Sequence, residues 1–443
     1  MTLSIKHLND DASFLLSFKP SGPDSSNAAI EPFRILLDPW VVGPSSIFHP
    51  KISTARPRNQ ACIASLAELP EPDLVIVSQD KSDHCNEATL RQLPATGTKT
   101  IILAEPNSAR LIRSWKHFDK AKVRTIPNWE DSSTCGQDRV VRTPVKPLVK
   151  GGQPGEVTIA FLKQAKDISG LLHAIGITYR APSLSSGSSS ENQAPSSSPP
   201  VSPISPLTPI SPFPPTARKS HIHLPMFSSN SSSNLACAGD FPSPPTSPGF
   251  FSLRSVRSAS SIPFSIFSTS TAVTNLTVPF TRPHSSASLG PTLSVMFAPH
   301  GISYASLDGY AKSHLAAESA LPLTALLHCF DSVTNPWWLG GKVLLGAPAG
   351  KETAKRLQAR VWISAHDGDK EVKGLATKFL ETKKWMADDL GRQLAEDKED
   401  GDRSAAAVID GSRPWKGTTV LNLGVGEEVM LDHEGIVNST ASC

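Results

Sequence analysis

A long Ser/Pro-rich stretch in the middle of the chain limits what this protein can fold into. Between about residues 181 and 290, the 443-residue sequence has few large apolar side chains and no hydrophobic periodicity. Such a composition buries too little apolar surface to offset the conformational entropy that folding would cost. We therefore predict a disordered insert over residues 181–290, so that any packed domain has to be built from the two flanking parts of the chain.

The insert also carries a repeated motif. A Ser-Pro or Thr-Pro pair recurs every three residues, starting at Ser202, Ser205, Thr208 and Ser211. This period matches that of a polyproline II helix, which recognition domains bind. The pattern predicts a segment used by proline-directed kinases or docking proteins, and the alternative is a passive spacer.

The flanks of the insert alternate between strand and helix patterns. Apolar runs of strand length, several of them followed by Gly, Pro, Asp or His, occupy residues 14–18, 34–37, 74–77, 100–103, 157–162, 175–179, 293–297, 325–327, 342–345 and 360–363. Helical patterns lie at 87–93, 109–115, 351–358 and, most clearly, 370–395. This alternation predicts one α/β domain made of residues 1–180 and 291–395. A charged linker and a C-terminal hairpin or tail are expected over 396–443.

Composition excludes several classes of protein. The formal net charge is only +3, and no basic run with interleaved aromatic residues occurs, so we expect no nucleic-acid partner. The six cysteines form no CxxC pair, which argues against a disulfide framework or a zinc ribbon. No signal peptide and no apolar run of membrane-spanning length is evident, so a cytoplasmic protein without a membrane partner is expected.

Polar clusters follow several of the predicted strands directly. Asp83 and His84 come after the run at 74–77, His300 after 293–297, and His366 after 360–363, while His173 precedes 175–179. In α/β sheets, ligands bind beyond the carboxyl ends of the strands, and imidazole with carboxylate suits zinc or iron. The sequence thus suggests a metal site, although each histidine alone could equally be a hydrogen-bonded loop residue.

Two of these segments resemble a known family. The stretch Ser78-Gln79-Asp80-Lys81-Ser82-Asp83-His84 resembles a degenerate copy of the x-H-x-H-x-D-H motif of the metallo-β-lactamase superfamily. Upstream, Leu36-Leu37-Asp38-Pro39-Trp40 resembles the L-x-D-P-W segment of its ascorbate-phosphate lactonase-like branch. Segments 173–176 and 351–366 resemble later histidine-bearing elements of that branch. The resemblance implies an αββα sandwich, two mixed sheets between helices, and a hydrolase-like protein of fungal type.

The departures from the family motif change the expected metal content. Gln79 and Lys81 stand where the family has the two histidines of its first metal, and neither suits a cation. Asp83, His84 and His366 match ligands of the second metal, and His300 stands near the position of the bridging aspartate of the family's Gly-Asp-Thr turn, which is not evident here. The resemblance thus implies one ion, zinc, with iron or manganese as alternatives, and hydrolysis of a small ester, lactone or phosphoester. His173, Gln79 and Asp80 are candidates for an additional site.

The candidate catalytic residues and a pair of tryptophans each have an alternative role. Lys81 and Asp83 are the candidate catalytic residues, with Lys81 placing positive charge where the first metal would stand. The alternative is an inactive fold, in which Asp83 and His84 only cap the following helix and the insert makes the protein a scaffold. Trp337 and Trp338 are either a substrate-binding loop or the closure of a core edge.

Overall fold

The structure is a computed structural model that describes residues 1–20, 31–47, 53–131, 139–186, 291–373, 379–401 and 417–440. The Ser/Pro-rich insert from residue 187 onward, with its repeated Ser-Pro motif, lies outside the described residues. No helix in the described ranges is long and apolar enough to cross a membrane.

The first sheet has eight strands in the order β23-β22-β1-β2-β3-β6-β7-β8. Its antiparallel half contains both ends of the chain, and β3, β6, β7 and β8 run parallel. The strands are β1 (Thr2–His7), β2 (Phe14–Lys19), β3 (Phe33–Leu37), β6 (Leu74–Val77), β7 (Ile101–Ala104), β8 (Val123–Thr125), β22 (Glu428–Leu431) and β23 (Ile436–Thr440).

The second sheet has seven strands in the order β21-β18-β15-β14-β12-β11-β9 and is mixed in the same way. The strands β9, β11, β12 and β14 are antiparallel, and β14, β15, β18 and β21 are parallel. Their bounds are β9 (Val141–Val145), β11 (Gly155–Lys163), β12 (His173–Arg180), β14 (Thr292–Ala298), β15 (Ala325–His328), β18 (Val361–Ile363) and β21 (Thr419–Leu421).

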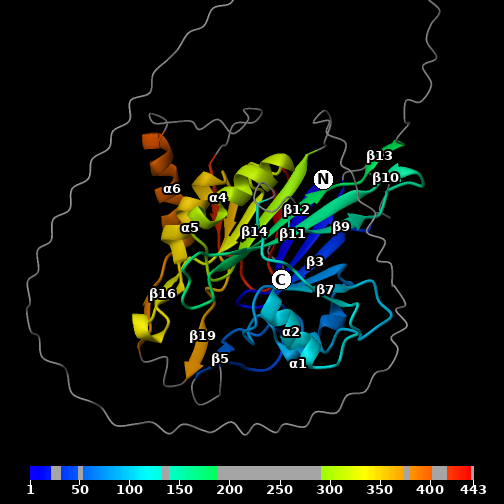
Figure 1. Cartoon of the computed structure of the whole chain (residues 1–443). Coiled ribbons are helices and arrows are strands. Elements are labelled where there is room, and N and C mark those ends of the chain that lie inside the picture. Colours follow the sequence, from blue (N-terminus) through cyan, green and yellow to red (C-terminus); the bar gives the residue numbers. More distant parts are fainter. Residues whose placement is uncertain are drawn as a thin grey trace, which may run out of the picture. The chain divides into compact units, whose positions relative to one another are not determined.

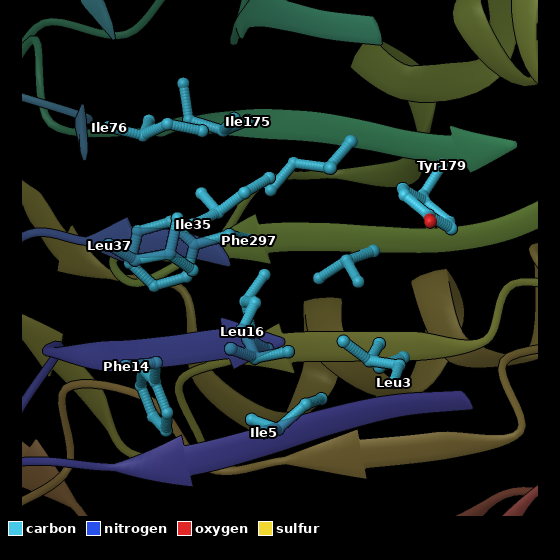
Figure 2. Packing of buried hydrophobic residues seen from close by; sticks show 14 of the residues in the cluster. Leu3, Ile5, Phe14, Leu16, Ile35, Leu37, Ile76, Ile175, Tyr179 and Phe297 are labelled. Carbon is cyan, nitrogen blue, oxygen red and sulfur yellow. The ribbon is translucent and has the colours of Figure 1, made fainter. Parts of the chain in front are cut away.

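The main core lies between these two sheets. Leu3, Leu16 and Ile35 of the first sheet face Ile175 and Phe297 of the second, as Figure 2 shows. All of these side chains are fully buried, and each contributes roughly 1.5–3 kcal/mol by leaving water. The alternation of buried and half-buried residues along β1 is the pattern of a strand with one face in this core.

Helices cover the two outer faces (Figure 1). Against the first sheet pack α1 (Glu87–Leu90) and α2 (Pro106–Ser114), with Leu90 and Ile112 buried on Val75 and Ile102. Against the second pack α4 (Tyr304–Tyr310), a π-helical turn (Ala311–Leu315), α5 (Gly346–Arg356) and α6 (Ala387–Gly401). The predicted αββα sandwich is therefore confirmed.

Small sheets surround this sandwich. One pairs β17 (Lys342–Leu344), β16 (Ser332–Thr334) and β20 (Glu381–Lys383), and another pairs β19 (Lys370–Lys373), β5 (Ser53–Pro57) and β4 (Ser45–Ile47). A third pairs β10 (Gly152–Gln153) with β13 (Ser183–Ser186), so the described part of the domain continues to Ser186, six residues into the predicted insert. A short 3₁₀ helix lies at Leu66–Glu68.

The C-terminal third of the chain differs most from the prediction. The predicted helix over 370–395 is wrong in its first half: residues 370–373 and 381–383 are strands, and the helix α6 begins only at Ala387. It continues past residue 395 to Gly401, into the expected linker. Within the expected C-terminal hairpin or tail, β21 belongs to the second sheet, whereas β22 belongs to the first and pairs antiparallel with β23. The terminal strands therefore belong to the sandwich.

Candidate metal centre

The polar residues after the parallel strands of both sheets meet at one edge of the sandwich. Asp38 follows β3, and His84 follows β6 by seven residues. From the second sheet come His300, two residues after β14, and His366, three residues after β18. One ligand atom from each of His84, His300 and His366 lies within 4.8 Å of the others, and all three residues are buried.

Asp38 fixes the orientation of His84. The fully buried carboxylate of Asp38 accepts hydrogen bonds from the Ser78 amide (2.7 Å) and hydroxyl (2.5 Å), and its Oδ2 lies 2.7 Å from Nδ1 of His84. The backbone around Asp38 is held in turn by Ser13, whose hydroxyl donates to the Asp38 carbonyl (2.6 Å) and accepts from the Trp40 amide (2.9 Å). Nδ1 of His84 therefore donates to Asp38, and Nε2 points into the site.

His300 faces His84 with the equivalent nitrogen. Nδ1 of His300 donates to the carbonyl of Val343 in β17 at 3.0 Å, which leaves Nε2 without a proton in the neutral ring. The two Nε2 atoms of His84 and His300 lie 3.1 Å apart. Two lone pairs at that distance repel each other unless a proton or a cation lies between them.

His366 reaches the same place with the help of the β1–β2 loop. Its Nδ1 lies 2.6 Å from Oδ1 of Asp11, and its amide donates to the Asp11 carbonyl (3.2 Å). The approach of the two loops requires a glycine at position 368, because a Cβ there would stand 1.4 Å from the carbonyl oxygen of Asp10. The His366 ring centroid lies 4.8 Å from that of His84 and 4.4 Å from that of His300.

This arrangement fits a metal ion. Metal-binding histidines usually have a carboxylate or carbonyl behind the second ring nitrogen, as His84, His300 and His366 all do here. Two imidazole nitrogens on one tetrahedral zinc ion lie roughly 3.3 Å apart, close to the 3.1 Å observed. Asp83 adds a buried carboxylate oxygen that has no hydrogen-bond partner among the described residues, and it groups with Asp11 and His366 as a second possible set of ligands.

The protonation of the three rings differs because their neighbours differ. Burial lowers the pKa of His84, but the carboxylates of Asp83 and Asp38 outweigh it, and the net pKa is raised. Burial, together with His366 and His84, lowers the pKa of His300 well below its ordinary value. For His366, burial again lowers the pKa, although Asp11 opposes it. A proton in this site therefore resides on His84, while His300 keeps a free lone pair.

Of the predicted ligands, the structure brings His84, His300 and His366 together, and it places Asp83 near His366 in the second group, with Asp11. The alternative in which Asp83 and His84 cap the next helix is wrong, because Asn86 is the cap and accepts from the Thr89 amide (2.9 Å).

The remaining candidates around the motif have other surroundings. Lys81 donates to Asp80 at 2.7 Å, and its side chain is 31% exposed, so these two residues pair with each other. Gln79 is buried, and neither of its amide atoms has a hydrogen-bond partner among the described residues. His173 is buried at the start of β12, its Nε2 also lacks such a partner, and burial lowers its pKa to about 3.

Trp337 and Trp338 lie in the turn between β16 and β17. Their exposed fractions are 82% and 59%, so the prediction that they close a core edge is wrong. The ring of Trp338 lies edge-on to that of Phe379, itself half exposed, with 5.8 Å between the centroids. The turn is connected to the site through β17, whose Val343 carbonyl binds His300.

Three residues of the site were not predicted as functional. Asp38 was visible as part of the D-P-W segment after a strand, but the sequence does not indicate that its carboxylate meets His84. Asp11 belongs to a short polar run between two strands, which ordinary turns also contain. Lys370 was assigned to a helix, and only the observed strand β19 turns it toward His366.

Comparisons with known proteins found one matching family model and similar solved structures. Residues 29–175 match the sequence model of a family described as the beta-lactamase superfamily domain. With the layer order described above, this match supports a metallo-β-lactamase-type sandwich. A search of curated proteins found no match. Among solved structures, a metallo hydrolase from the hyperthermophilic archaeon Ignicoccus hospitalis is similar, with a TM-score of 0.38 and 11% identity over 98% of this chain and 99% of that one.

Proposed function

We propose that this protein is a hydrolase that uses one divalent metal ion, held by His84, His300 and His366 with Asp83, to cleave a small ester, lactone or phosphoester. The observation that supports this most strongly is the set of three buried imidazoles, each with an oxygen behind its second nitrogen. Zinc suits this ligand set, with iron and manganese as alternatives. Among the substrates, the resemblance of the D-P-W segment favours a lactone.

When bound, such an ion would act as a Lewis acid and lower the pKa of a water molecule. The protein's own residues position the ligands and accept the proton. Asp38 and the Val343 carbonyl hold His84 and His300 in place, so no reorientation is needed during reaction. The buried Oδ1 of Asp83, which accepts no hydrogen bond within the described part of the chain, can bind the ion or accept a proton from the attacking water. The exposed Trp337 and Trp338 would stack on the substrate.

The test begins with elemental analysis of the purified full-length protein. We expect about one zinc, iron or manganese per chain, and loss of that metal in the Asp83→Ala/His366→Ala double variant. His117→Ala is the matched control, because this histidine lies beyond α2 and contacts the Leu93 carbonyl, away from the three clustered histidines. Activity on generic esters, lactones and phosphoesters should be lost with the metal. A folded wild-type protein that binds no metal would disprove the proposal.

A second function is supported by the same histidine pair. The 3.1 Å between Nε2 of His84 and Nε2 of His300 is also a hydrogen-bond distance, and the raised pKa of His84 beside the lowered pKa of His300 allows one shared proton to close the site. In that case the protein is an inactive scaffold that acts through its insert, recognised by proline-directed kinases or docking proteins. Deleting the insert would then abolish partner capture while leaving the fold intact, and unchanged capture would exclude this function.

A further inference from the structure

Lys370 brings a positive charge into the centre of the site. It is the first residue of β19, which pairs with β5, and its side chain is only 13% exposed. Its Nζ lies 2.7 Å from Oδ1 of Asp11 and 3.2 and 3.4 Å from Nδ1 and Nε2 of His366. The ammonium thus contacts one carboxylate and one imidazole of the candidate metal centre at once.

The surroundings of this ammonium would otherwise suit a second cation. Asp11, Asp83 and His366 each offer a ligand atom, and these atoms lie within 4.8 Å of one another. Asp11 is fully buried, and its Oδ1 lies within 2.7 Å of two nitrogens, Nζ of Lys370 and Nδ1 of His366. A buried carboxylate needs a positive partner, and Lys370 supplies it.

Lys370 contacts Asp11 and His366, and this inference rests on the one-metal hydrolase proposed above. We propose that Lys370 permanently occupies a second cation site that Asp11 forms with Asp83 and His366, two ligands shared with the proposed metal. Its ammonium balances the charge of Asp11 and repels a second divalent ion, so the centre admits only one metal. The same ammonium places a positive charge beside His366, where it can stabilise negative charge that develops on the substrate. This is the role predicted for Lys81, whose own ammonium pairs with Asp80.

The experiment compares zinc stoichiometry in wild-type protein and the Lys370→Met variant, by titration calorimetry and elemental analysis. Methionine keeps the length of the side chain and removes its charge. We expect the variant to bind one zinc equivalent more than wild type, and its kcat to fall at least tenfold with little change in KM. Lys370→Arg should keep the wild-type stoichiometry. Adding Asp11→Asn to Lys370→Met should remove the extra equivalent, because the anionic ligand is lost.

Lys384→Met is the matched control, because Lys384 is a nearby lysine whose ion pair with Asp369 is exposed. It should change neither stoichiometry nor kcat. A folded Lys370→Met variant with the wild-type stoichiometry would overturn the inference, and if methionine prevents folding, Lys370→Gln serves the same test. The two proposals fail in different ways. A wild-type protein that binds no metal disproves the hydrolase proposal. A wild-type protein and a Lys370→Met variant that bind the same amount of metal disprove the role of Lys370.

Discussion

Asp38 shows how one buried side chain can determine the chemistry of another. Its backbone adopts a positive φ of 38°, unusual for a residue other than glycine, and this conformation is maintained by hydrogen bonds from its neighbours. The carboxylate of Asp38 also aligns the ring of His84. The charges of Asp83 and Asp38 both raise the pKa of this ring. Such backbone strain is typical of functional sites.

Replacing Asp38 with asparagine should therefore weaken metal binding without removing a direct ligand. The amide carries no charge and can present its NH₂ to Nδ1 of His84, which would favour the wrong tautomer. We expect zinc affinity to fall about 10–100-fold, the usual effect of losing such a partner. Competition with a chelator measures this zinc affinity. Asp369→Asn, at an exposed ion pair, is the control, and equal affinities in the two variants would refute the role of Asp38.

Metal affinity should also depend on pH through His84. Below its raised pKa this ring carries a proton that an ion has to displace, so affinity should fall by about tenfold per pH unit as the pH drops below that pKa. His300, whose pKa is lowered, is already neutral there and adds no such dependence. Calorimetry in buffers of different ionisation enthalpy would count the proton released. Binding without proton release would show that His84 is neutral before the ion binds.

At the scale of elements, local patterns predicted most strands of the two sheets and the histidines that follow them, but not Lys370 or Asp11. His84, His300 and His366 were found because each follows an apolar run, and parallel strands share one edge. Lys370 was missed because Val372, Leu375 and Phe379 repeat at helical spacing, whereas the pairing of β19 with β5 depends on residues more than 300 positions away. Asp11 was missed for a similar reason, since its partners come from the far end of the sequence.

Two glycines in neighbouring helices should respond oppositely to alanine. In α5, a Cβ at Gly350 would stand 2.3 Å from Cζ2 of Trp362, so Gly350→Ala should destabilise the fold by about 1–3 kcal/mol through overpacking. In α6, nothing lies within 4 Å of a Cβ at Gly391, so Gly391→Ala should stabilise it by about 1 kcal/mol through helix propensity. Thermal melting measures both. Equal shifts of the melting temperature in the two variants would contradict the packing of α5 on Trp362.

At the scale of the whole molecule, the described residues on the two sides of the insert adjoin neighbouring strands of the second sheet. Arg180 at the end of β12 pairs with Thr292 at the start of β14, and these strands carry His173 and His300 at their opposite ends. The described chain thus ends at Ser186 in β13, six residues beyond β12, and resumes at Pro291, directly before β14, next to the strand ends opposite to His173 and His300.

Replacing residues 187–290 with a short Gly/Ser linker should leave the fold and the metal content unchanged. Loop-closure entropy grows by only about 0.6 kcal/mol per doubling of length, so the shortened protein should be more stable by about 2 kcal/mol at most. Denaturant unfolding measures the stability of the shortened protein, and elemental analysis measures its metal content. Loss of metal or a collapse in stability would show that the insert contributes to the domain.

The distribution of strands between the two sides of the insert has a consequence for a cleaved chain. In the first sheet β22 pairs with β1, and in the second β14 pairs with β12, so each sheet is completed by strands from both sides. The candidate centre is divided likewise, with Asp38 and His84 on one side and His300, His366 and Lys370 on the other. A protease cut within the insert would thus yield two fragments that hold each other in the native form. Expressed separately, they would behave as a split protein whose reassembly could be followed by recovery of metal binding.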